Sequence, residues 1–275
     1  MTTRVNDILV LGATGKTGRR LVPRLRAKGA TVRAASRSGE VTFDWTKPAT
    51  WPAAVQGAGA VYLVAPDDPG PLPEFLSLAS KSVRHIVQLS GRGLDAVDGD
   101  FAGMATAERL VRDSGADWTV LRANNFNQNF DEDLWQPPLA AGRLALPAGD
   151  VPEPFIDADD IADVAALVLT EAGHGGRQYE LSGPQTLTFA EATEIIARAA
   201  GRPISYVELT PEAYRAELAT TGYPPEVIDA LDALFAAMRA GHSAQPTDDV
   251  RTLLGREGTP FTTYAERAAR AGAWG

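Results

Sequence analysis

Residues 7–18 constrain the fold of this chain more than any other stretch. They read Asp-Ile-Leu-Val-Leu-Gly-Ala-Thr-Gly-Lys-Thr-Gly, so an apolar run ends at Gly12 and glycines recur at Gly15 and Gly18. Residues 19–27 then carry apolar side chains at helical spacing. This order predicts a buried strand, a glycine turn and a helix whose N-terminus faces a phosphate-bearing ligand.

Each of the three glycines has a physical reason to lack a side chain. Gly12 suits the tight turn, Gly15 lets a ligand approach the backbone, and Gly18 allows the helix to pack closely on the strand. The spacing is G-x-x-G-x-x-G rather than the G-x-G-x-x-G of many dehydrogenases. A glycine-rich connection without a ligand is the alternative, and the position between strand and helix favours a dinucleotide.

The pattern of the whole chain predicts an α/β fold. Strands and helices alternate up to about residue 122, which is typical of a doubly wound, Rossmann-like parallel sheet. After residue 125 the texture changes, and further helices and short strands predict a small C-terminal α/β lobe. We expect a dinucleotide-binding domain over residues 1–150 and a smaller substrate-binding lobe over residues 151–275, with parts of the two intertwined.

Composition excludes several classes of function. The 275 residues include no cysteine and only three histidines, which lie far apart in the sequence, so we expect no metal site. A net charge of −9 argues against nucleic acid as a partner. There is no apolar run of 18 residues and no apolar signal core at the N-terminus, so we expect a cytoplasmic protein without a membrane span.

The second predicted strand, over residues 30–37, bears on the choice of cofactor. An acidic residue at its end would accept the ribose 2′-hydroxyl and select NAD, but here Ser36, Arg37 and Ser38 follow one another. An arginine and two hydroxyls suit a 2′-phosphate, so NADPH is predicted to be preferred over NAD. Asp44 and Trp45 are candidates for contact with the adenine; alternatively, Arg37 is a surface arginine and Trp45 covers the edge of the sheet.

Amides and aromatic side chains cluster after the strand predicted near residue 121. Asn124, Asn125 and Asn127 can donate to a substrate oxygen, and Phe126 and Phe155 can stack on a ring. Phe130 and Trp135 belong to the same group. Core packing is the alternative for every one of these aromatics. The helix predicted over residues 225–240 has an apolar stripe that can line a cleft.

Several separate segments resemble the NmrA-like family of atypical short-chain dehydrogenases/reductases. They are Val10-Leu-Gly-Ala-Thr-Gly-Lys-Thr-Gly18, Phe43-Asp-Trp45, Leu89-Ser-Gly91, Ala107-Glu-Arg-Leu-Val-Arg-Asp-Ser-Gly115, Trp118-Thr-Val-Leu-Arg122 with Asn125-Phe126, Phe155-Ile-Asp157 with Asp160-Ile-Ala162, Tyr179-Glu-Leu-Ser-Gly-Pro184 and the tail from Thr247 to Arg256. The resemblance spans nearly the whole chain.

The resemblance implies an NAD(P)-binding fold whose C-terminal lobe lies over the nicotinamide. It places the pyrophosphate at Gly12, Thr14, Gly15, Lys16, Thr17 and Gly18, the 2′-phosphate near Arg37, the adenine near Asp44 and Trp45, and the ribose near Ala65 and Pro66. It places Ser90 and the segment Asn125-Phe126 near the nicotinamide and the substrate.

One departure from the superfamily pattern concerns the proton donor. Counting back from Glu108, the positions of the usual Tyr-x-x-x-Lys pair hold Asp100 and Met104. Neither can lower the pKa of a tyrosine or pass on its proton. The catalytic residues are therefore unknown from sequence, with Ser90 and Asn125 as candidates.

These features predict an NAD(P)H-dependent reductase of a quinone-like or other small aromatic molecule, working as a monomer or homodimer. A quinone suits the site because its reduced anion can take a proton from water. By analogy with the family, the reaction belongs to the tailoring of aromatic polyketides. Two alternatives remain: a monooxygenase-type tailoring enzyme of the same fold, and a non-catalytic dinucleotide sensor of the NmrA type.

Overall fold

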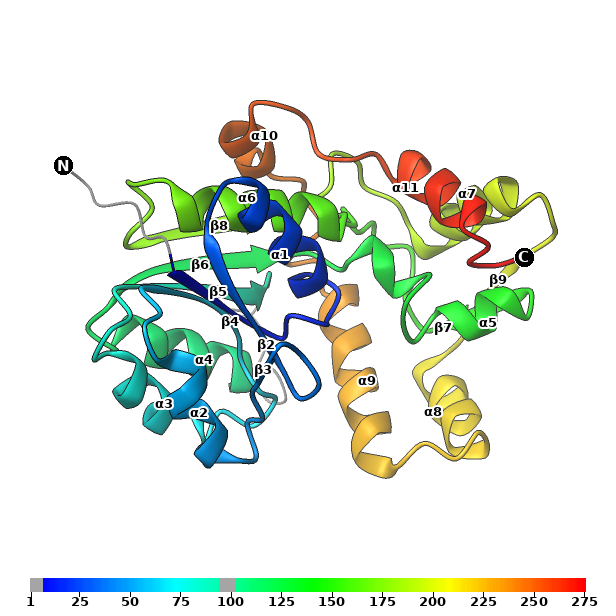
Figure 1. Ribbon diagram of the computed structural model, residues 1–275. Helices are drawn as coiled ribbons and strands as arrows, with labels where there is room; N and C mark the ends of the chain where they lie inside the picture. Colours follow the sequence, from blue (N-terminus) through cyan, green and yellow to red (C-terminus); the bar gives the residue numbers. More distant parts are fainter. Residues whose placement is uncertain (1–6, 94–101) are drawn as a thin grey trace.

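The computed structural model describes residues 7–93 and 102–275, and its centre is a seven-stranded sheet in which every pair of neighbours is parallel (Figure 1). The strand order is β3-β2-β1-β4-β5-β6-β8, which confirms the doubly wound fold. The strands of this sheet are β1 (Asp7–Leu11), β2 (Thr31–Ser36), β3 (Val41–Thr42), β4 (Ala60–Val64), β5 (His85–Gly91), β6 (Asp117–Ala123) and β8 (Arg177–Leu181).

The strand order reverses between β1 and β4, and this places the ligand crevice. Val10 of β1 lies opposite Ala34 of β2 on one side and Tyr62 of β4 on the other. From β1 the chain continues outward to β2 and β3, and later returns to build β4, β5 and β6 on the opposite side. Ligands of open α/β sheets bind outside the carboxyl ends of the strands at such a reversal, here just after Leu11 and Val64.

Helices cover both faces of the sheet (Figure 1). On one face lie α1 (Gly18–Ala27), α6 (Ala158–Thr170) and α10 (Asp249–Leu254), and on the other lie α2 (Trp51–Val55), α3 (Leu72–Ala79) and α4 (Ala102–Arg112), with the 3₁₀ turn η1 (Pro48–Thr50) before α2. Successive residues of β1 point into different cores: Val10 packs with Leu21 of α1, whereas Leu9 packs with Phe75 of α3. A strand buried on both faces explains the unbroken apolar runs in the sequence.

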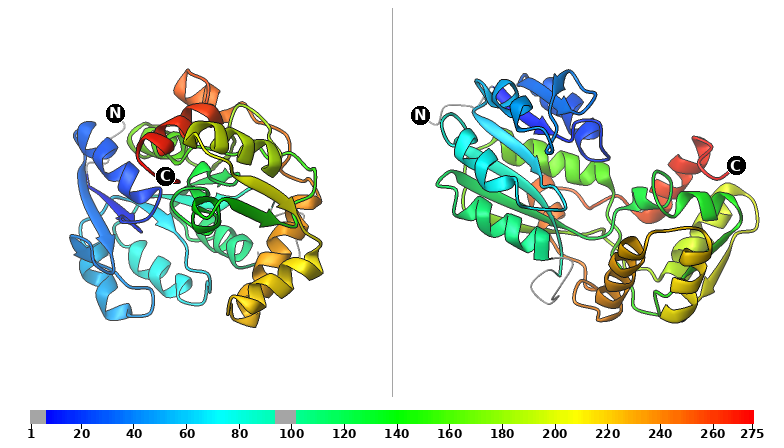
Figure 2. Two further views of the ribbon diagram at one scale, coloured as in Figure 1. Left: turned by 90° about the vertical axis from the view of Figure 1, so that its right-hand side faces the viewer. Right: turned by 90° about the horizontal axis from the view of Figure 1, so that it is seen from below.

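A second, smaller core forms the lobe seen beside the sheet in Figure 2. Its two parallel strands are β7 (Arg143–Leu146) and β9 (Ser205–Glu208), and its helices are α5 (Gln136–Ala140), α7 (Phe189–Ala200), α8 (Pro211–Thr220), α9 (Pro225–Arg239) and α11 (Phe261–Arg270), after the 3₁₀ turn η3 (Asn127–Asn129). After β7 the chain returns to the large sheet, where α6 packs on one face and β8 forms an edge strand. The chain therefore passes between the two parts more than once. The domain boundary at residue 150 stays a prediction.

Two short elements have local physical reasons for their length. β3 pairs only through Val41 and Thr42, because Phe43 and Trp45 turn into a cluster of aromatic rings with Trp51 and Phe75. The short helix α5 contains two prolines near its start, where proline is tolerated. Within the described ranges, the helices lack the length and apolar character that a membrane span requires.

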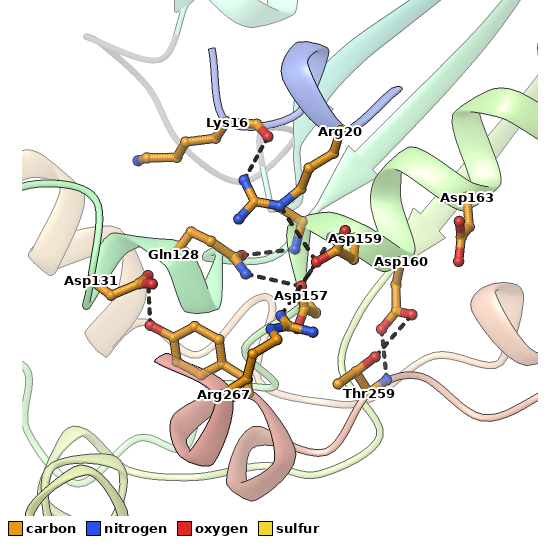
Figure 3. A network of polar contacts seen from close by, with 12 residues as sticks. Lys16, Arg20, Gln128, Asp131, Asp157, Asp159, Asp160, Asp163, Thr259 and Arg267 are labelled. Carbon is orange, nitrogen blue, oxygen red and sulfur yellow. Dashed lines mark hydrogen bonds and ion pairs between the residues drawn. The ribbon is translucent and has the colours of Figure 1, made fainter. Parts of the chain in front are cut away.

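A network of charged side chains joins α1 and α6 to the small lobe (Figure 3). Arg20 pairs with Asp159 and with Glu132, which follows η3. Asp157 caps α6 by accepting from the Asp159 backbone, and its second oxygen pairs with Arg267 of α11 at 2.6 Å. Asp157 is thus the N-cap of α6, and the same carboxylate also holds the two parts of the chain together.

Candidate active site

The glycine turn has the geometry that its sequence requires. Gly12 has φ of +67°, which favours glycine, and the Gly15 backbone N–H donates to the Gly12 carbonyl at 2.9 Å. A Cβ atom on Gly18 would lie 2.8 Å from the Ala13 Cα and closer still to the Gly12 carbonyl oxygen. Since these obstacles are backbone atoms, only glycine fits at residue 18. Thr14 and Gly15 are exposed on the outer side of the turn.

The start of α1 suits an anion. In the described structure α1 has no side-chain cap and no acidic residue in its first turn, so its positive dipole end is not neutralised from within the helix. The Lys16 amino group donates to Asn129 Oδ1 at 2.7 Å and pairs with Asp133, while Thr17 is buried. The residues predicted to hold a pyrophosphate therefore surround an uncapped helix N-terminus, and this turn fits that group.

The end of β2 offers an uncommitted cation and an uncommitted hydroxyl. The Arg37 side chain is exposed and forms no hydrogen bond or ion pair with the described residues. Ser36 is buried, and its Oγ has no partner among the residues that the structure describes. An orphaned hydroxyl beside a free guanidinium fits a bound phosphate group.

The two residues predicted near the adenine already make contacts of their own. Asp44 Oδ1 accepts from the backbone and the hydroxyl of Thr46, at 3.0 and 2.8 Å, and these hydrogen bonds lower the pKa of Asp44. Trp45 stands edge-on to Phe43 at 4.9 Å and remains partly exposed. Contact of either residue with an adenine stays a prediction.

A cavity of about 300 Å³ lies beyond the carboxyl ends of β4, β5 and β6. Its walls come from the glycine turn, these strand ends, α4, and α9 with the segment that follows it. The lining residues are Lys16, Val64, Ala65, Gln88, Leu89, Ser90, Gly91, Arg92, Gly93, Met104, Ala123, Asn124, Asn125, Phe126, Asn129, Glu153, Leu234, Ala237, Met238, His242 and Ser243. The cavity thus borders the glycine turn at Lys16, and its wall combines apolar surface with polar groups, as small-molecule sites do.

Ser90 belongs to a buried ion-pair cluster beside the cavity. Its hydroxyl donates to Glu108 Oε1 at 2.7 Å, and the Arg122 guanidinium holds both oxygens of the same carboxylate, at 2.9 and 2.8 Å. Glu108 and Arg122 are 3% and 5% exposed. Because the Ser90 hydroxyl donates its proton to Glu108, it can accept a hydrogen bond from a ligand in the cavity but cannot donate one to that ligand. Its catalytic role stays a prediction.

The predicted substrate residues do not all reach the cavity. Asn124, Asn125 and Phe126 line it, whereas Phe155 and Asn127 do not. Phe155 is 2% exposed and packs edge-on against Phe130 and Phe189 in the core of the small lobe. The structure thus places Phe155 in the core, which was the alternative for the aromatics, because its strand-like segment turns toward α7 and α11.

Other positions singled out in the sequence have mixed outcomes. Met104, at the position of the usual lysine, lines the cavity, and Asp100 lies outside the described residues. Leu234 and Met238 of the apolar stripe line the cavity as expected, while Phe235 packs into the small lobe. Pro66 directly follows Ala65 but is not part of the wall.

Gln88 and Glu153 are polar residues of the wall that the sequence motifs do not indicate. Gln88 is buried, and both atoms of its amide lack a partner among the described residues. Glu153 is 4% exposed, and its Oε1 accepts from Asn124 Nδ2 at 2.6 Å and from the Asn125 backbone and side chain at 3.3 Å each. Burial raises the pKa of Glu153, against the opposite effect of these hydrogen bonds and of Arg92. No sequence motif marks either residue.

A doubly wound sheet, a glycine turn and a cavity that borders that turn define a dinucleotide-binding protein. Comparison with known proteins agrees: a model of NAD(P)H-binding proteins matches residues 12–172, and a model of the NmrA-like family matches residues 97–262. The chain belongs to the NmrA-like family and is an NAD(P)H-dependent oxidoreductase.

Two curated relatives match over almost their full length. The (4-alkanoyl-5-oxo-2,5-dihydrofuran-3-yl)methyl phosphate reductase of Streptomyces griseus is 35% identical over 280 residues, covering 96% of this chain and 98% of the relative. The NAD(P)H azoreductase of Xenophilus azovorans is 32% identical over 282 residues, with the same coverage.

Among solved structures, an NADPH-dependent quinone oxidoreductase from Escherichia coli has the same fold. It superposes with a TM-score of 0.78 at 24% identity and covers 94% of this chain and 98% of its own. At this identity the likeness concerns the fold.

Proposed function

We propose that this protein uses NADPH to reduce a quinone-like, small aromatic substrate bound in the cavity between the ends of β5 and β6 and helix α9. The observation that carries the proposal is the cavity wall, in which Phe126, Leu234 and Met238 provide apolar surface and Asn125 provides an amide. A flat ring with oxygen substituents matches both features, because its faces are apolar and its oxygens can accept hydrogen bonds from an amide. The reductase, azoreductase and quinone oxidoreductase names of the relatives and neighbour support this class of substrate.

The cofactor would be held by the glycine turn, the start of α1 and the end of β2. When bound, NADPH would supply a hydride, that is, a proton together with two electrons, to an electron-poor acceptor. The protein's part is to position the acceptor and to exclude water from the apolar wall. Asn125 stands at the wall to orient a substrate oxygen. No tyrosine–lysine pair is required of this chain, because a reduced quinone is far less basic than the alkoxide formed from a simple ketone, and a carboxyl group is acidic enough to protonate it.

The preference for NADPH is expected to depend on Arg37. Replacing Arg37 by alanine removes a charge-assisted contact to the 2′-phosphate, so the Kd for NADPH should rise about 10- to 100-fold. The Kd for NADH, which lacks this phosphate, should change less than about twofold on the same grounds. Fluorescence titration of both cofactors into both proteins measures these values. Equal affinities of the wild type for NADH and NADPH would refute the preference.

Filling the cavity from α9 tests where the substrate binds. Ala237 lines the cavity, whereas the neighbouring Ala236 is exposed on the outer side of α9. Ala237→Phe should raise KM for 1,4-naphthoquinone about tenfold or more, the range expected when packing in an apolar pocket is lost, and leave the NADPH Kd nearly unchanged. Ala236→Phe is the matched control and should resemble the wild type. Identical kinetics of the two variants would place the substrate elsewhere.

The substrate class itself is tested with a panel of acceptors. Initial rates of NADPH oxidation are compared for naphthoquinones, anthraquinones, an azo dye and simple aldehydes and ketones. We expect turnover of the quinones and little with the aldehydes and ketones, because a simple carbonyl accepts hydride far less readily than an electron-poor quinone. A reversed order, or NADPH binding without turnover of any acceptor, would contradict the proposal.

A further inference from the structure

Among the described residues of the cavity wall, Glu153 is the one carboxyl, and its two oxygens face different surroundings. Oε1 receives all three of the hydrogen bonds from Asn124 and Asn125. Oε2 receives no hydrogen bond from the described residues, and it is not fully enclosed by protein atoms. Since Glu153 lines the cavity, Oε2 is the oxygen open to a ligand.

The surroundings of Glu153 suit both protonation states of a proton donor. Its burial disfavours the charged form and raises the pKa of this carboxyl. Once the proton has left, three N–H groups already point at Oε1 and stabilise the carboxylate, and Arg92 lies nearby to add a positive charge. A carboxyl in such a balance can release a proton and regain it from solvent.

The other charged and titratable groups around Glu153 do not replace it. Arg92 is committed to Asn124, to Glu180 and to the carbonyls of Ser243 and Gln245. Lys16 is tied to Asn129 and Asp133. His242 is exposed at the rim.

We propose that Glu153 is the general acid of this enzyme and protonates an oxygen of the reduced substrate. The assignment rests on the proposed reduction of a quinone-like substrate. The overall reaction is quinone plus NADPH plus H⁺ giving hydroquinone plus NADP⁺. The hydride carries both electrons and, once the reduced ring has tautomerised, one of the two O–H hydrogens of the hydroquinone. The O–H bond of the Glu153 carboxyl breaks as the other O–H bond of the hydroquinone forms, and a proton from solvent restores the carboxyl.

Two hydride acceptors that differ in their need for a proton separate this role from a structural one. 1,4-Naphthoquinone needs hydride and proton, whereas a cationic triarylmethane dye becomes neutral by accepting hydride alone. Glu153→Gln should lower kcat for naphthoquinone about 100-fold, within the usual range for loss of a general acid. It should change kcat for the dye less than about twofold, because that reaction needs no general acid. Glu194→Gln, on the exposed face of α7, is the matched control and should behave as the wild type.

The pH profile provides a second readout. Because the acid must be protonated to act, kcat of the wild type for naphthoquinone should fall as pH rises through the pKa of Glu153, and the Gln variant should lose this fall. An equal loss with both acceptors would show that Glu153 only positions the substrate, and an unchanged rate with naphthoquinone would show that it is no donor. The His242→Gln variant gives the pH profile without the histidine at the rim. If kcat of this variant for naphthoquinone no longer falls as the pH rises, His242 and not Glu153 is the proton donor.

A measurement without cofactor or substrate separates this proposal from the proposed function. Infrared difference spectra of the protein on raising the pH should show a carbonyl band of a protonated carboxyl that is lost above the ordinary titration range of glutamate. The component of this band that belongs to Glu153 should be missing in Glu153→Gln. Absence of the band in the wild type overturns the proton donor whatever the substrate is. Presence of the band, with no turnover of any quinone, overturns the substrate class and leaves Glu153 as a protonated acid in the cavity.

Discussion

Replacing Glu108 by alanine is expected to lower the free energy of unfolding by about 3–5 kcal/mol, the usual cost of removing one partner of a buried ion pair. Glu108 is 3% exposed and accepts hydrogen bonds from Ser90, Arg122 and, at 3.2 Å, Arg112. Without this carboxylate the buried Arg122 guanidinium keeps the longer, 3.8 Å contact with Glu180 but loses its paired, two-oxygen partner. Chemical denaturation followed by circular dichroism measures the change.

The matched control for Glu108 is an exposed ion pair. Glu217 pairs with Arg143 at 2.8 Å, and about half of each side chain is accessible to solvent. Glu217→Ala should therefore change the free energy of unfolding by less than about 1 kcal/mol. A Glu108→Ala protein as stable as the Glu217→Ala protein would mean that the cluster beneath the cavity contributes no net stability.

Gly18→Ala is expected to damage both the fold and the binding of cofactor. The added Cβ would meet backbone atoms of Gly12 and Ala13, which cannot move aside as a flexible side chain can. We expect a loss of about 1–3 kcal/mol in the free energy of unfolding, the cost of overpacking a close-packed site. The start of α1 must shift to relieve the contact, so the NADPH Kd should rise at least about tenfold, given that phosphate binding depends on the helix N–H groups.

Gly15→Ala separates the two effects. A Cβ on Gly15 would lie 3.2 Å from the Gly12 carbonyl oxygen and point toward solvent in the protein without ligand. This variant should lose less than about 1 kcal/mol of stability, because a small local adjustment suffices. It should still weaken NADPH binding, since the methyl group occupies the side on which the pyrophosphate is predicted to approach. Unchanged NADPH affinity in both variants would contradict the predicted role of the turn.

Most of the fold could be predicted from local patterns in the sequence. Apolar runs such as residues 60–65 mark strands buried on both faces, and the glycines at residues 12, 15 and 18 mark the turn that reverses the chain onto α1. The capping box formed by Thr188 and Glu191 is another local feature of this kind. These features depend on neighbours within a few residues, which a sequence displays directly.

The walls of the cavity were harder to predict from the sequence, because they depend on contacts between segments that are distant in the chain. Phe126 and Phe155 look alike in the sequence, yet one lines the cavity and the other lies in the core of the small lobe. Glu153 acquires its character from Asn124, Asn125 and Arg92, which lie 28 or more positions away. Only the packing of α9 and of the segment before α6 against the ends of β5 and β6 brings these groups together.

The most direct test of the account is an anaerobic reaction of the protein with one equivalent of NADPH and one of 1,4-naphthoquinone, followed by the absorbance of the reduced nicotinamide. We predict that NADPH is fully oxidised with formation of one equivalent of hydroquinone, and that Ala237→Phe slows this reaction while NADPH still binds. NADPH that binds to the wild type but stays reduced in the presence of the quinone would contradict the account.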